Sequence, residues 1–65
     1  MDRLSHSDMA HSLDLMAAAK SNWLSRFSSG KDKRPDFEIG QKRADLDVIQ
    51  QAAADYRAAA NREAA

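Results

Sequence analysis

The side chains that could do metal or acid–base chemistry are scattered along this sequence rather than clustered. The two histidines, His6 and His11, are five residues apart. On a helix they would point about 140° away from each other and would not form the four-residue pair that binds a metal. Cysteine is absent, which removes both thiolate ligands and disulfides. We therefore expect no metal site and no cofactor, and we interpret both histidines as surface residues.

Gly30 followed by Lys31 is superficially similar to a phosphate-binding loop. Asp32 stands where such a loop needs a hydroxyl residue, the upstream glycine is missing, and no strand pattern precedes it. No paired carboxylate cleft, Ser-His-Asp arrangement or dinucleotide fingerprint is present either. The sequence therefore predicts that the protein is not an enzyme.

Basic residues concentrate around the same segment and form the one candidate anion contact: Arg26, Lys31, Lys33, Arg34 and Arg43. From Lys20 to Arg43 there are seven basic and three acidic residues, a net charge of +4. The rest of the chain has three basic and seven acidic residues, a net charge of −4. Two interpretations stay open: an ordinary solvated turn, or a charged end that contacts phosphate or selects a partner's orientation.

Lys20 and Lys42 interrupt otherwise apolar patterns. In one interpretation their aliphatic stems pack while the ammonium groups reach solvent. In the other, Lys42 lies over the Trp23 ring and Lys20 lies beside Asp45, which would fix the register of two helices. A nucleophilic lysine is not expected, because neither a second base nor an enclosed pocket accompanies it.

Two apolar stripes at alternating four- and three-residue spacing must position these groups. The candidate seam residues are Met9, Leu13, Met16, Trp23 and Phe27 in the first stripe, and Ile39, Leu46, Ile49, Ala53 and Tyr56 in the second. That period is typical of helices that face another helix. We predict an all-α fold, a two-helix antiparallel hairpin in one domain over residues 1–65. Its parts are a helix over about 5–28, a basic turn over 29–35 and a helix over about 36–61.

Local signals support these boundaries. Ser5 is a candidate N-cap, Gly30 a left-handed stop, and Pro35 or Asp36 the start of the second helix. Gly40 is a weak point that costs about 1 kcal/mol relative to alanine. If the helices are antiparallel about this turn, positions whose numbers sum to about 65 are level with each other.

A hairpin of 65 residues is small and leaves the flanks of both stripes in water. Such a chain buries only about 60% of its unfolded surface, and without disulfides oligomerisation is the usual remedy. We therefore expect a homodimer that forms a four-helix bundle, with antiparallel hairpins because of the uneven charge. In the facing register Met16 is expected to meet Ile49.

The function expected from these features is a small non-enzymatic protein–protein interaction or regulatory module that acts through helix faces. The alternatives are a nucleic-acid-associated protein whose basic turn contacts phosphate, or a structural assembly subunit. The longest apolar run, Leu15–Ala19, is far shorter than the roughly 20 residues that cross a bilayer, and no signal-peptide core is present. We therefore expect a cytoplasmic protein without membrane contact.

Overall fold

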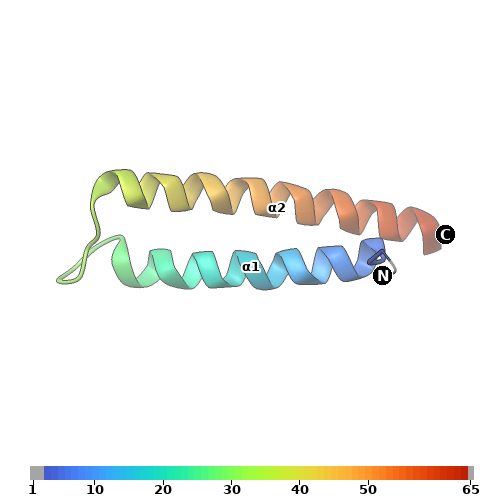
Figure 1. Cartoon of the computed structure of the whole chain (residues 1–65), viewed down its shortest axis with the longest axis horizontal. Helices are drawn as coiled ribbons and strands as arrows, with labels where there is room; N and C mark the ends of the chain where they lie inside the picture. The colour runs from blue at the N-terminus through green and yellow to red at the C-terminus, as the bar shows by residue number, and fades with distance from the viewer. Residues whose placement is uncertain (1–2, 65) are drawn as a thin grey trace.

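The computed structural model describes residues 3–64, which form two helices joined by one connection (Figure 1). Helix α1 spans His6–Phe27 and helix α2 spans Asp36–Ala64. They lie side by side and antiparallel along the length of a molecule that measures 48 × 22 × 15 Å. The predicted all-α helical hairpin is therefore confirmed. Neither helix has a stretch both long and apolar enough to span a membrane.

Each end of α1 follows from a local signal in the sequence. The backbone N–H of Asp8 donates to the Ser5 hydroxyl oxygen at 3.0 Å, which confirms Ser5 as the N-cap. At the other end the Ser28 N–H donates to the Leu24 carbonyl at 3.0 Å. Gly30 follows with a φ of 83°, a left-handed conformation that glycine adopts without steric cost. The helix therefore stops where the sequence predicts.

A backbone hydrogen bond joins the two ends of the connection between the helices. The Arg34 N–H donates to the Phe27 carbonyl at 2.8 Å, which returns the chain beside the end of α1. Asp36 then begins α2, and the Pro35 carbonyl accepts from the Ile39 N–H at 3.2 Å. The second helix was predicted to end near residue 61. That boundary is wrong, because α2 continues for another turn to Ala64 through alanine-rich sequence of high helix propensity.

The inner face of α2 follows the predicted spacing. Its buried or half-buried residues include Ile39, Leu46, Ile49, Ala53 and Tyr56. Ile39 is 7% exposed and Ala53 only 3%. The apolar period therefore identifies which side of this helix faces α1.

The inner face of α1 is rotated from the predicted stripe. Its positions at alternating four- and three-residue spacing are all buried or half-buried: His6, Ala10, Leu13, Ala17, Lys20, Leu24 and Phe27. The predicted stripe shares Leu13 and Phe27 with this seam, and Lys20, which interrupts the predicted stripe, also lies in it. Met16, expected to meet Ile49 inside the hairpin, is 51% exposed and lies outside the buried and half-buried seam of α1.

Side-chain size explains the rotation. Ala10 is 5% exposed and, like the half-buried Ala17, puts a small side chain in the seam, where it lets the helices approach closely. The larger Met9 and Trp23 are half-buried at the flank instead. Among residues 3–64 the buried hydrophobic side chains are Ala10, Ile39 and Ala53, so the enclosed core of one hairpin is very small.

Charged pairs join the two helices along their length. Lys20 Nζ lies 3.9 Å from an Asp45 carboxylate oxygen, as the sequence suggested. Arg57 donates to Asp14. All four side chains are 30–51% exposed, so each pair contributes little stability and acts mainly on register.

Candidate interaction surface

One broad face of the hairpin carries large apolar side chains from α1. Met9, Met16 and Trp23 follow each other at seven-residue intervals and therefore lie on one flank of the helix. Met16 is 51% exposed, while Met9 and Trp23 are half-buried. We call these three residues the methionine–tryptophan stripe.

The neighbouring flank of α2 belongs to the same face. Glu38, Asp45, Ala52 and Ala59 also recur every seven residues, and all are half-buried. Trp23 lines one groove together with Glu38, which places the two flanks on one side of the molecule. This face therefore combines the exposed Met16 with small alanines toward the terminal end and with the Glu38 and Asp45 carboxylates toward the turn.

The opposite face is polar. A shallow hollow there is lined by Ser7, Ala10, His11, Asp14, Arg57, Ala60 and Asn61. It contains the Asp14–Arg57 ion pair. The hairpin is therefore two-sided, with one face suited to water and the other suited to burial.

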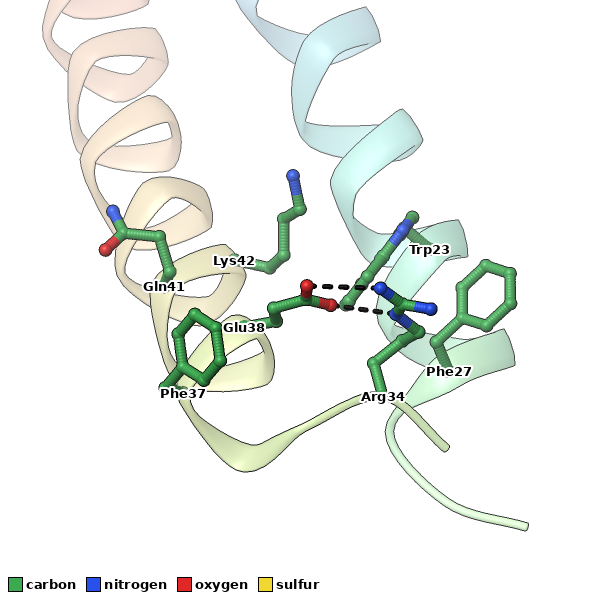
Figure 2. A pocket seen from close by; sticks show the side chains of 7 residues that line it. All are labelled: Trp23, Phe27, Arg34, Phe37, Glu38, Gln41 and Lys42. Atoms are coloured by element: carbon green, nitrogen blue, oxygen red, sulfur yellow. Dashed lines mark hydrogen bonds and ion pairs between the residues drawn. The ribbon is translucent and has the colours of Figure 1, made fainter. Parts of the chain in front are cut away.

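The apolar face ends in a groove of about 520 Å³ beside the turn (Figure 2). It is lined by Trp23, Phe27, Arg34, Phe37, Glu38, Gln41 and Lys42, and we call it the turn groove. Trp23 and Phe27 come from α1, whereas Phe37 stands on α2 and is 77% exposed. An aromatic side chain this exposed is a common anchor for a partner.

Aromatic and cationic side chains pack together on the α1 side of the turn groove. The Trp23 and Phe27 ring centroids are 5.2 Å apart and tilted by 49°. Lys42 Nζ lies 5.4 Å from the centroid of the Trp23 ring, within cation–π range. The prediction that Lys42 lies over Trp23 is confirmed, and this lysine is held by the aromatic ring rather than by an ion pair among the described residues.

An ion pair crosses the turn groove. Arg34 donates from Nε and Nη2 to the two Glu38 carboxylate oxygens at 2.8 and 3.1 Å (Figure 2). The hydrogen bond from Arg34 lowers the pKa of Glu38, and the same bond raises the pKa of Arg34. Both groups therefore stay charged over the neutral range.

A second turn cation is engaged in the same way. Lys33 Nζ lies 2.7 Å from an Asp36 carboxylate oxygen, and this hydrogen bond lowers the pKa of Asp36. The Arg26 guanidinium lies 5.4 Å from the centroid of the Phe27 ring. Lys31 and Arg43 are exposed and make no ion pair within residues 3–64. Two of the five predicted anion contacts are thus already neutralised by the chain's own carboxylates.

Several groove and seam residues were missed by the sequence reasoning. Phe37 and Gln41 lie off the seam spacing, so an apolar period gives no sign of them. The Asp14–Arg57 pair was also missed, because its residue numbers sum to 71 and it therefore lies off the predicted register of about 65.

Comparison with known protein families, with curated proteins and with solved structures finds nothing that matches this chain. The fold and the surface define the class of molecule directly. It is a helical hairpin with one polar face and one apolar face that ends in an aromatic groove.

Proposed function

We propose that this protein is a small non-enzymatic protein–protein interaction module that works as a homodimer. The observation that carries the proposal is the uncovered apolar face. Within residues 3–64 one hairpin buries three hydrophobic side chains, Ala10, Ile39 and Ala53, while Met16 and Phe37 stay exposed at 51% and 77%. A second copy laid on this face makes a four-helix bundle and gives the molecule an enclosed interior.

The nucleic-acid alternative draws less support from the turn. Arg34 is paired with Glu38 and Lys33 with Asp36, so fewer cations remain free for phosphate. A protein that neutralises phosphates also loses affinity steeply with rising salt. Association through the apolar face should lose much less affinity with rising salt, because apolar burial contributes most of it and the complementary charges of the two ends contribute less, so the steepness of a salt series separates the two functions.

The test compares the association of two neighbouring variants by sedimentation equilibrium. Met16 lies on the apolar face, whereas Leu15 is two residues from both Leu13 and Ala17 and therefore points away from the seam. Their exposures are similar, 51% and 60%. Met16→Glu should give a monomer, because it places a charge in the interface, while Leu15→Glu should remain a dimer.

Three outcomes count against the proposal. A wild-type protein that stays monomeric at micromolar concentration contradicts it directly. Loss of the dimer to the same extent in both variants also contradicts it, since that would mean that a charge on the apolar face has no greater effect than a charge elsewhere on α1. Equal association of Met16→Glu and wild type would place the interface elsewhere.

A further inference from the structure

We propose that the second copy packs antiparallel on the apolar face, with a twofold axis beside Met16, so that each copy's N-terminal end covers the other's turn groove. This inference rests on the proposed homodimer and adds its geometry. Four features of the described residues support it: the symmetry of the methionine–tryptophan stripe, the charge distribution, the turn groove and the area of the face.

The stripe is symmetric about its centre. Helix α1 spans His6–Phe27, so its midpoint falls beside Met16. Met9 and Trp23 lie seven residues to either side. A twofold axis across the helix at Met16 brings the Met16 side chains of the two copies together. It also brings Met9 of each copy against Trp23 of the other copy. Large apolar side chains are thereby matched along the whole of α1.

The charge of the chain favours this orientation over the parallel one. The segment from Lys20 to Arg43 has a net charge of +4 and surrounds the turn, whereas the remainder has −4 and lies toward the termini. Antiparallel stacking sets each positive end on a negative end. Parallel stacking sets like charges together within the Debye length of about 10 Å at 0.1 M salt.

The turn groove receives an apolar occupant in this arrangement. Leu4 precedes α1 and is 58% exposed. Leu4 lies twelve residues before Met16, and Ser28 lies twelve residues after it. The twofold axis relates Leu4 of one copy to the level of Ser28, next to Phe27, of the other copy. The axis at Met16 therefore brings Leu4 and Met9 of one copy over Phe27 and Trp23 of the other. These side chains suit a groove walled by aromatic rings.

The face is large enough for a stable dimer. The hairpin is 48 Å long, 22 Å wide and 15 Å thick, so the broad face offers the largest contact area. Its outline bounds about 1,000 Å² per copy, compared with about 800 Å² per partner in a standard interface.

The two orientations place different helices in contact. An axis across the helices lays α1 on α1 of the second copy, with Met16 near itself. An axis along the helices lays α1 on α2 of the second copy, and no residue of α1 then lies near its own copy. Cysteine crosslinking reads this difference, and the chain has no cysteine of its own.

The experiment uses three single variants of the full chain under mild oxidation: Met16→Cys, Met9→Cys and Leu15→Cys. Only Met16→Cys should form a covalent dimer rapidly, about tenfold faster than either control, because a disulfide needs Cβ atoms about 4 Å apart. In the proposed dimer the two Met9 positions are about 21 Å apart, at about 1.5 Å for each of fourteen residues. Leu15 points out of the interface.

Sedimentation of the wild type and of the reduced variants shows whether the homodimer exists, independently of whether its copies are antiparallel. A dimer in which Met16→Cys crosslinks no faster than Leu15→Cys overturns the antiparallel placement and leaves the homodimer standing. Rapid crosslinking of both Met9→Cys and Met16→Cys overturns it too, since it indicates α1 helices in parallel. A wild-type monomer overturns the proposed function itself.

Discussion

Replacing each of the two glycines by alanine tests the backbone of the hairpin with one chemical change. A Cβ atom added at Gly30 or at Gly40 meets no atom within 4 Å, so neither substitution creates a clash. The positions differ in backbone conformation. Gly40 lies inside α2, whereas Gly30 has a φ of 83°. Any difference between the variants therefore reports on backbone energetics alone.

The expected effects have opposite signs. Gly40→Ala should stabilise the protein by about 0.8–1 kcal/mol, because alanine loses less conformational entropy in a helix. Gly30→Ala should destabilise it by about 1–2 kcal/mol, the cost of a Cβ atom in the left-handed region. For a domain of this size about 1 kcal/mol shifts the melting temperature by about 4–8 °C. The two variants should therefore melt at least about 7 °C apart.

Thermal unfolding followed by far-ultraviolet circular dichroism measures both variants against wild type. All three must be at one protein concentration, because a dimer's melting temperature depends on it. Urea titration supplies a second readout, with unchanged slopes and shifted midpoints. A lower melting temperature for Gly40→Ala would mean that α2 is not continuous there. An unchanged one for Gly30→Ala would mean that the turn has another conformation.

Three further predictions concern the buried Ile39, the cations of the turn, and the loss of stability at acidic pH. Ile39→Ala should cost about 2–4 kcal/mol by urea titration, and a loss below about 1 kcal/mol would contradict burial of this side chain. Replacing the three exposed turn cations, Lys31, Lys33 and Arg34, by glutamine should lower stability much less than Ile39→Ala does, since surface ion pairs contribute little. A loss as large as that of Ile39→Ala would refute their exposure. Arg34 lowers the pKa of the Glu38 carboxyl in the folded state, so on acidification the unfolded chain protonates this carboxyl first. The stability that this ion pair contributes is therefore present above the ordinary glutamate pKa of about 4.3 and is lost as the pH falls below it. Glu38→Gln should therefore flatten the acid side of the stability–pH curve, and an unchanged curve would show that the ion pair is absent in solution.

Much of the fold follows from the sequence because the signals are local. A serine cap, a glycine stop and a proline-led start each act within one helical turn, and all three predicted boundaries agree with the structure. The inner face of α2 was also predicted, since its apolar residues lie at one helical period. The Lys42–Trp23 and Lys20–Asp45 contacts followed from that register.

The face of α1 was harder to predict, for a physical reason. Hydrophobicity favours Met9, Met16 and Trp23 as seam residues, but close helix packing favours small side chains. Ala10 and Ala17 take the seam, and the larger residues move to the flank. Which of these two sets of residues lies in the seam depends on the distance between the helices, and that distance cannot be read from the residue types of α1 alone. The same rotation creates the turn groove, so the groove could not be predicted either.

The single tight connection between α1 and α2 has a kinetic consequence. Every contact between the helices is made across residues 28–35, so closing the hairpin requires only a short loop and the remaining pairs can form outward from it. Chains with such local contacts fold in microseconds to milliseconds. Encounter of two hairpins depends on concentration and is slower in dilute solution. Refolding of the proposed dimer should therefore have an early phase independent of dilution and a later phase that slows with it.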